Sequence, residues 1–180
     1  MKRRLVVLLL AAAPAFGAYS YYYGDALTSI NTSNWYVNGT VTATASGLTS
    51  TNSGGGSLIS KIGSFADYEI KTTLNIDPTA YYKGEFFHYL RATSDAKQGP
   101  SSTGSFYSVG IEAIAYSSEH LVYTATLTVY KRVGGILTQL ASVEISIPNG
   151  SELRSILRGS RLDVWLNGVW HASVTDTSLP

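Results

Sequence analysis

Few residues in this 180-residue chain could carry out covalent or acid–base chemistry. The chain has no cysteine, which excludes a thiol nucleophile and a thiolate metal site. Its histidines, His88, His120 and His171, form no H-E-x-x-H motif and no close grouping with aspartate, and we interpret His88 as a hydrogen-bonded core residue. The G-x-S-x-G elbow of serine hydrolases is also missing. Carboxylates are therefore the first candidates for catalysis.

Hydrolysis of a glycosidic bond takes two carboxylates, which lie about 5–5.5 Å apart in retaining enzymes. Asp67 and Glu69 are two residues apart in a predicted strand and share its face, and we interpret them as solvent-exposed. Glu85 begins a later strand, and Glu112 lies on the less apolar face of another. Glu112 could accept hydrogen bonds from a sugar in a groove, or it could be an ordinary exposed carboxylate.

Aromatic residues offer a different chemistry, since 13 Tyr, 3 Trp and 5 Phe are present. Sugar rings stack their C–H faces on aromatic planes, while polar neighbours fix the orientation. Tyr89 and Arg91 are predicted to share one face of a central strand, and Trp165 shares a face with Asp163. Tyrosine is also common in cross-strand pairs that bind nothing, so each ring has a structural alternative. The aromatic candidates are Tyr81, Tyr82, Tyr89, Tyr107, Tyr116, Trp165 and Trp170. The residues that we predict to bind a ligand are Tyr89, Arg91, Tyr107, Glu112 and Trp165.

The elements that position these side chains are predicted to be β-strands. Stretches such as "DYEIKTTLNI" and "TATLTVYKRV" alternate with a period of two, and the chain is rich in Thr, Ser, Tyr, Val and Gly. Gly134-Gly135 and Asn167-Gly168 each join two alternating runs, which is typical of a hairpin. We expect about ten strands and no helix longer than a turn. This pattern predicts an all-β protein, either a sandwich of two antiparallel sheets or a barrel.

The first residues have the features of an export signal. "MKRR" is followed by an apolar run over Leu5 to Ala13 and then by small residues, which predicts cleavage after Gly17 or one residue later. An uncleaved anchor is the alternative. We therefore expect a signal peptide over residues 1–18 and a single domain over residues 19–180, secreted or held at the cell surface. The formal net charge is +1, which argues against nucleic acid as a partner, and no second apolar run is long enough to cross a membrane.

The order of the segments resembles a known superfamily. "NWYVNGTVTATASGLTSTNSGGGSLISKI", "FADYEIKTTLNI", "EFFHYLRATSD" and "LRSILRGSRLDVWLNGVWHASVTD" follow one another as in the concanavalin A-like lectin/glucanase superfamily. Bacterial laminin-G-like domains are the nearest fit, and the likeness covers the chain from about Asp25 to the end. It implies a jelly-roll sandwich of two antiparallel sheets.

The chain departs from that superfamily near its end. In relatives the aspartate after the hairpin precedes further strands, whereas Asp176 is followed only by "TSLP". We expect either that the closing strands are missing or that this branch closes the sandwich differently. A missing strand would leave an open sheet edge, to which another chain can pair.

The resemblance also sets the expected function. The Glu-x-Asp-x-Glu string of the superfamily's glycanases is missing, so we predict an exported, non-catalytic module that binds carbohydrate or mediates adhesion. A divergent glycoside hydrolase using Glu85 or Glu112 is the first alternative, and a structural module that pairs through an open edge is the second. No cofactor is predicted, although the superfamily commonly holds calcium, to which Asp25, Asp163 and Asp176 could contribute; no acidic loop of defined spacing is present.

Overall fold

The chain folds as an all-β protein in a computed structural model. The structure describes residues 7–11, 21–25, 29, 32–33, 35–39, 42–44, 47–49, 56–60, 67–74, 85–93, 95–96, 104–117 and 122–179. These residues form fourteen strands. Within the same ranges there is no helix, and hence none long and apolar enough to span a bilayer.

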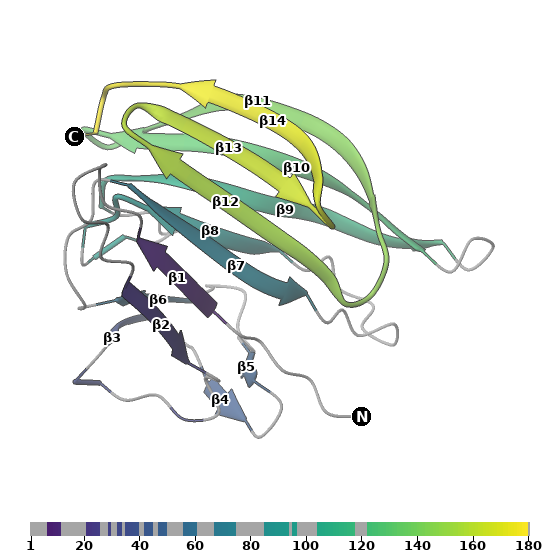
Figure 1. Ribbon diagram of the computed structural model, residues 1–180, viewed down its shortest axis with the longest axis horizontal. Helices are drawn as coiled ribbons and strands as arrows, with labels where there is room; N and C mark the ends of the chain where they lie inside the picture. The colour runs from purple at the N-terminus through teal and green to yellow at the C-terminus, as the bar shows by residue number, and fades with distance from the viewer. Residues whose placement is uncertain are drawn as a thin grey trace.

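The larger sheet has six strands in the order β14-β13-β12-β7-β1-β2, and every neighbouring pair is antiparallel. Figure 1 shows it in front of the second sheet. Its strands are β1 (Val7–Ala11), β2 (Tyr21–Asp25), β7 (Tyr68–Leu74), β12 (Ser151–Arg158), β13 (Arg161–Leu166) and β14 (Val169–Thr175).

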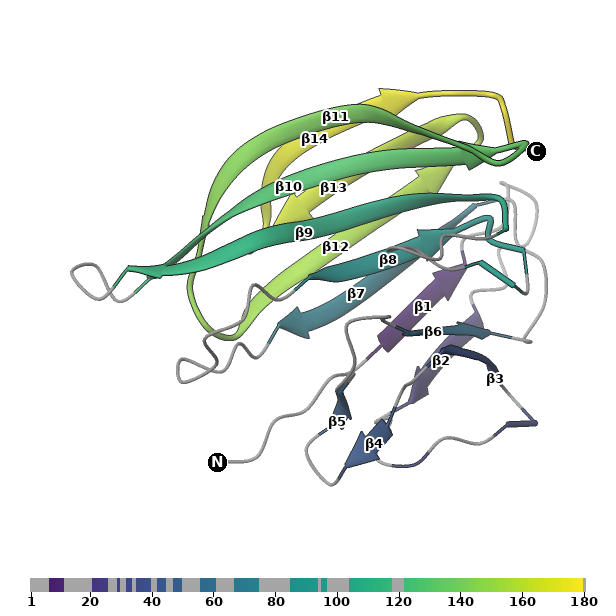
Figure 2. The same cartoon turned by 180° about the vertical axis from the view of Figure 1, so that it is seen from behind.

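The second sheet has four strands in the order β11-β10-β9-β8, again all antiparallel. Figure 2 shows the same two layers from behind. The strands of this sheet are β8 (Phe86–Leu90), β9 (Phe106–Ser117), β10 (Val122–Val133) and β11 (Ile136–Ile147). Two short ribbons complete the described elements, β3 (Trp35–Gly39) with β6 (Gly56–Ser60) and β4 (Thr42–Thr44) with β5 (Gly47–Thr49).

The hydrophobic core lies between the two main sheets. Alternate residues of each strand face inward, as in β7, where Ile70, Thr72 and Leu74 are buried and the residues between them are not. The opposite sheet contributes fully buried residues such as Ile111 and Leu127. One apolar cluster joins side chains of both sheets. The prediction of a two-sheet antiparallel sandwich is therefore confirmed.

Both predicted hairpins are also confirmed. Gly134 and Gly135 have φ angles of 57° and 84° and connect β10 to β11. Asn167 and Gly168 have φ angles of 51° and 77° and connect β13 to β14. Two consecutive residues with positive φ match the right-handed twist of the flanking strands, which explains why Gly-Gly and Asn-Gly occur here.

The position predicted for Arg91 is wrong in one respect. Strand β8 is an edge strand of the four-stranded sheet and not a central one, and it ends at Leu90. Arg91 follows with a φ of 47°, which is outside the extended region. Its side chain therefore does not continue the face on which Tyr89 lies.

Strand β1 comes from the apolar run that we predict to be part of a signal peptide. It pairs with β7 on one side, from Leu8 opposite Lys71 to Ala11 opposite Tyr68, and with β2 on the other. Export and the division into residues 1–18 and 19–180 stay predictions.

Candidate functional site

The candidate site is the outer surface of the four-stranded sheet, which we call the β8–β11 face. Its side chains alternate with core residues, and the strand register arranges them in rows that cross the sheet. Glu85, one residue before β8, continues the register opposite Glu112 and begins the first row. Four of the rows are Glu85–Glu112–Thr126–Glu144, Phe87–Gly110–Thr128–Ser142, Tyr89–Ser108–Tyr130–Gln139 and Phe106–Arg132–Leu137.

Two aromatic rings lie side by side along the edge of this face. The Phe87 ring covers Gly110 so closely that a Cβ atom on that glycine would lie 2.3 Å and 2.6 Å from two ring carbons. The Tyr89 ring meets Phe106 edge to face at 5.0 Å and lies 6.3 Å from the Phe87 ring, centroid to centroid. Phe87 and Tyr89 are both half-buried. They form an amphipathic surface of the kind that contacts sugar rings.

A carboxylate is held beside these rings. Glu112 Oε2 accepts hydrogen bonds from Thr128 Oγ1 at 2.8 Å and from Tyr130 Oη at 3.1 Å. Burial and the charge of Glu112 raise the pKa of the Tyr130 phenol, which keeps it protonated as a donor. Both bonds end on Oε2, so among the described residues Oε1 of Glu112 accepts none.

Glu85 is electrostatically coupled to this carboxylate. Its side chain is exposed, yet partial desolvation and then the charge of Glu112 raise its pKa above the usual value. Like charges directly opposite each other on neighbouring strands destabilise a sheet. The pair therefore lowers the stability of the sheet.

The structure separates the five predicted ligand-binding residues into three places. Tyr89 and Glu112 lie on the β8–β11 face. Tyr107 and Arg91 lie at one end of the sandwich, where they contact the C-terminal residues. Trp165 lies on the outer surface of the six-stranded sheet, since Val164 and Leu166 beside it are in the core. The five residues therefore do not form one site.

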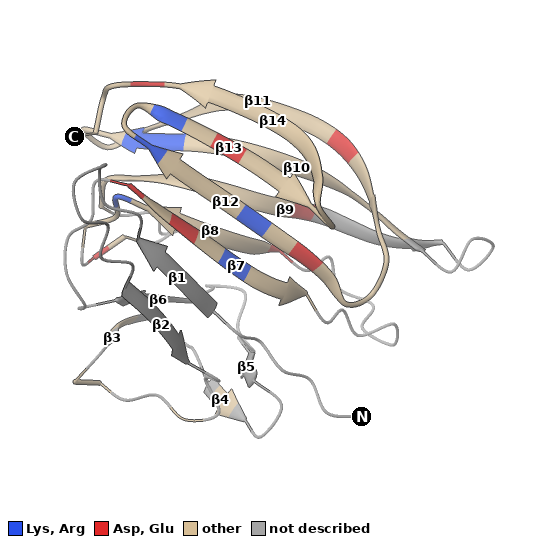
Figure 3. Ribbon diagram, in the orientation of Figure 1, with Lys and Arg blue, Asp and Glu red and all other residues tan. Residues whose placement is uncertain are grey.

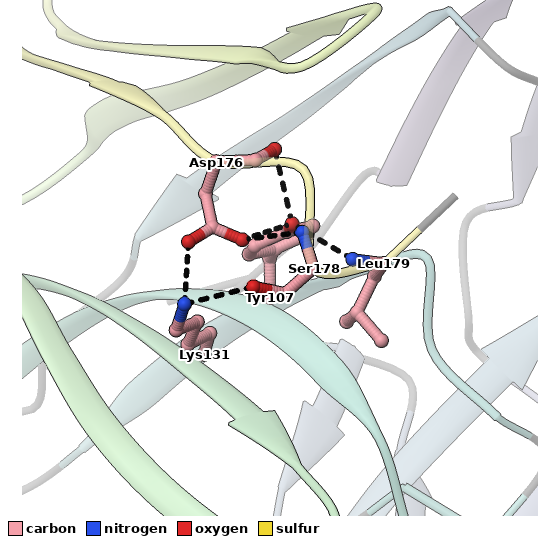
Figure 4. Close-up of polar contacts among 5 residues, drawn as sticks. All are labelled: Tyr107, Lys131, Asp176, Ser178 and Leu179. Carbon is pink, nitrogen blue, oxygen red and sulfur yellow. Dashed lines mark hydrogen bonds and ion pairs between the residues drawn. The ribbon is translucent and has the colours of Figure 1, made fainter.

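At the end of the sandwich, polar groups hold the C-terminal segment against the sheets (Figure 4). Asp176 accepts bonds from Lys131 Nζ at 2.5 Å and from Tyr107 Oη at 2.7 Å, and Tyr107 Oη accepts one from Leu179 N at 3.1 Å. Burial opposes ionisation of Asp176, but its bonds from Lys131, Ser178 and Tyr107 outweigh it and hold its pKa well below the usual value.

Arg91 also holds the C-terminal segment against the sheets. Its guanidinium donates to the carbonyl oxygens of Leu179 and Gly159, each at 2.7 Å. A small pocket nearby is lined by Tyr107, Leu157, Ser160, Leu162, Val174 and Asp176. Arg91 and Tyr107, which we predicted to bind a ligand, therefore hold the C-terminal segment in place.

The outer surface of the six-stranded sheet is charged but largely paired. Figure 3 shows basic and acidic positions beside each other on β7 and β12. Glu69 binds Arg154 at 2.7 Å, and Lys71 lies 3.7 Å from both Glu69 and Glu152. Asp67 accepts a bond from Gly159 N at 2.6 Å. Asp67 and Glu69, which we predicted to be exposed, are instead half-buried, and each contacts another residue of the protein.

His88 lies in the core, as predicted. It bridges the two sheets, with Nδ1 2.8 Å from Ser155 Oγ and Nε2 hydrogen-bonded to Thr72 Oγ1. Burial lowers its pKa to about 3, so the ring is neutral at ordinary pH.

Within the described parts of the chain, the other carboxylates and histidines add no metal site. Among the residues that the structure describes, no three His, Asp or Glu side chains lie close enough together to hold a metal ion. Tyr81, Tyr82 and His120 lie outside those residues, as does the side chain of Asp25.

Sequence reasoning did not single out Phe87, Thr128 or Tyr130 as members of a site. The alternation in "TATLTVYKRV" puts Thr128 and Tyr130 on one face, which was a usable signal. Thr128 and Tyr130 come close to Glu112 because β9 pairs with β10, and this pairing cannot be predicted from the alternation within one strand.

Comparison with known proteins supports the fold. The sequence matches no known protein family and no curated protein. The structure is similar to that of the carbohydrate binding module CBM66 from Bacillus subtilis, with a TM-score of 0.60, 18% sequence identity and 81% of each chain covered. This likeness supports the β-sandwich fold, while the concanavalin A-like superfamily and the narrower laminin-G-like assignment stay predictions.

Proposed function

We propose that this protein is an exported, non-catalytic recognition module that binds an extracellular glycan at the β8–β11 face. The observation that carries the proposal is the placement of two half-buried rings, Phe87 and Tyr89, beside a carboxylate anchored by Thr128 and Tyr130. Similarity to a solved protein that is itself named a carbohydrate binding module supports it.

Each part of the face has a task in sugar binding. The rings of Phe87 and Tyr89 contact the C–H faces of a pyranose or furanose and exclude water from them. Oε1 of Glu112 accepts a hydrogen bond from a sugar hydroxyl, and exposed Ser142 and Gln139 add polar contacts at the far side of the rows. Every contact in this proposal is made by a protein side chain, so the proposal predicts that chelation by EDTA leaves binding unchanged.

The test is a glycan array followed by calorimetry on the ligands that bind. Tyr89→Ala is expected to weaken binding about tenfold or more, because it removes one ring of the platform. Trp165→Ala is the matched control, since it removes a larger ring from the other sheet. Unchanged binding in folded Tyr89→Ala, or loss of binding in Trp165→Ala alone, would contradict the proposal.

A second function, glycoside hydrolysis, is favoured by one observation. Glu85 and Glu112 lie opposite each other, and the charge of Glu112 helps to raise the pKa of Glu85, as a general acid requires. A reducing-sugar assay separates this function from simple binding. Hydrolysis that disappears in both Glu85→Gln and Glu112→Gln would establish an enzyme, whereas glycan binding without product supports the recognition module.

A further inference from the structure

The Glu112 carboxylate is held in one orientation by hydrogen bonds from other residues of the β8–β11 face. Thr128, whose side chain is buried, and Tyr130 both donate to Oε2, and the two donors come from alternate positions of one strand. Two bonds from one rigid strand to one oxygen restrict the rotation of the carboxylate. The side chain therefore presents its other oxygen in a defined direction.

The fixed carboxylate limits what a ligand can offer. An ionised carboxylate accepts hydrogen bonds but donates none, so Oε1 needs a hydroxyl or another N–H or O–H group opposite it. A uronate or sulfate would place a second acceptor there, unpaired and of the same charge. Glu85 and Glu144 occupy the same row, which contains no Lys or Arg to offset this charge. Arg132, a cation of this face, lies three rows away, opposite Phe106 and Leu137.

We infer that Glu112 is the specificity-determining residue of the face and makes it select uncharged glycans over anionic ones. This inference rests on the proposed function and adds the ligand class to it. Thr128 and Tyr130 are positioning residues that act through Glu112. Phe87 and Tyr89 supply contact with any sugar ring and do not distinguish the two classes.

The experiment compares matched glycans by calorimetry: glucan with glucuronan, galactan with galacturonan, and mannan with mannuronan. The wild type is expected to bind at least one neutral member at least about tenfold more tightly than its uronate partner. In Glu112→Gln, the amide oxygen can keep the bonds from Thr128 and Tyr130, which turns the NH₂ group toward the ligand. The preference should then fall about tenfold, with uronate binding gained.

Tyr130→Phe keeps the ring and removes one bond to Oε2. We expect a severalfold loss of neutral binding and a smaller preference, while Tyr89→Ala should weaken both classes by the same factor and keep the ratio. Glu152→Gln, on the other sheet, is the charge-matched control and should change nothing. Unfolding curves show which variants are folded. If Glu112→Gln does not fold, the ratio of neutral to uronate affinity in Tyr130→Phe takes its place as the test.

The outcomes separate the inference from the proposed function. If the wild type binds no glycan, the proposed function fails and the inference with it. If it binds glycans at this face but prefers uronates, or if Glu112→Gln keeps the wild-type ratio, the inference alone is overturned.

Discussion

His88 couples the stability of the sandwich to pH. Its pKa is about 3 in the folded chain and about 6.5 in an unfolded one, so between these values only the unfolded chain binds the proton. The contribution of His88 to stability is complete above about pH 6.5. It is lost progressively as the pH falls from about 6.5 to about 3.

Urea unfolding between pH 7 and pH 4 measures this contribution. His88→Gln is expected to be less stable than the wild type at pH 7 but to lose less further stability in acid. Ser155→Ala removes the partner of Nδ1 and keeps the imidazole, so it should retain the steep acid dependence. Parallel pH profiles for the wild type and His88→Gln would show that the histidine is not buried as a neutral ring.

Gly110 is needed for the position of the Phe87 ring. Because a Cβ atom there would lie 2.3 Å from the ring, Gly110→Ala should push the ring outward and lower the free energy of unfolding by about 1–3 kcal/mol. The same change should weaken glycan binding. A double-mutant cycle with Phe87→Leu checks the cause, since the alanine should cost less when the ring is gone. Additive effects would place the clash elsewhere.

At the scale of elements, the segment from Asp176 to Leu179 depends on the Asp176 carboxylate. Asp176→Asn weakens the ion pair with Lys131 and the bond from Tyr107, and we expect a loss of about 1–3 kcal/mol in the free energy of unfolding. Asp163→Asn is the control, because its partner Arg161 is exposed and the pair should contribute less than about 1 kcal/mol. Equal effects of the two variants would mean that the segment is not anchored by Asp176.

The sequence predicted those elements whose signals are local. Alternation predicted β-strands, in which Ile70, Val164 and Leu166 lie in the core, and the turn residues at Asn167-Gly168 and Gly134-Gly135 marked hairpins. Arg91 departed from its strand because parity does not reveal where a strand ends. The approach of Glu85 to Glu112 depends on the register between β8 and β9, which no single segment contains. The site was therefore less predictable than the fold.

For the whole molecule, the two outer surfaces differ in how their charges are balanced. On the six-stranded sheet, Glu69, Lys71 and Arg154 form a chain of ion pairs. On the β8–β11 face, Glu85 and Glu112 face each other without a described cation in their row. Those charged groups of the six-stranded sheet pair with one another. On the β8–β11 face, Oε1 of Glu112 accepts no hydrogen bond from the described residues, so a ligand can donate to it. This difference is a reason for proposing that the ligand binds at the four-stranded sheet.

Export would change the larger sheet, because the predicted cleavage removes the residues that form β1. In a chain lacking residues 1–17, the amides of β7 that face β1 should exchange hydrogen faster than in the full chain, while those that face β12 stay protected. The freed edge of β7 is also a template for another strand, so the shortened chain should associate as its concentration rises. Exchange measured by NMR and sedimentation tests both statements, with the β12–β13 amides as the internal control. Unchanged protection of β7 in a monomeric shortened chain would mean that its edge is covered by a segment other than β1.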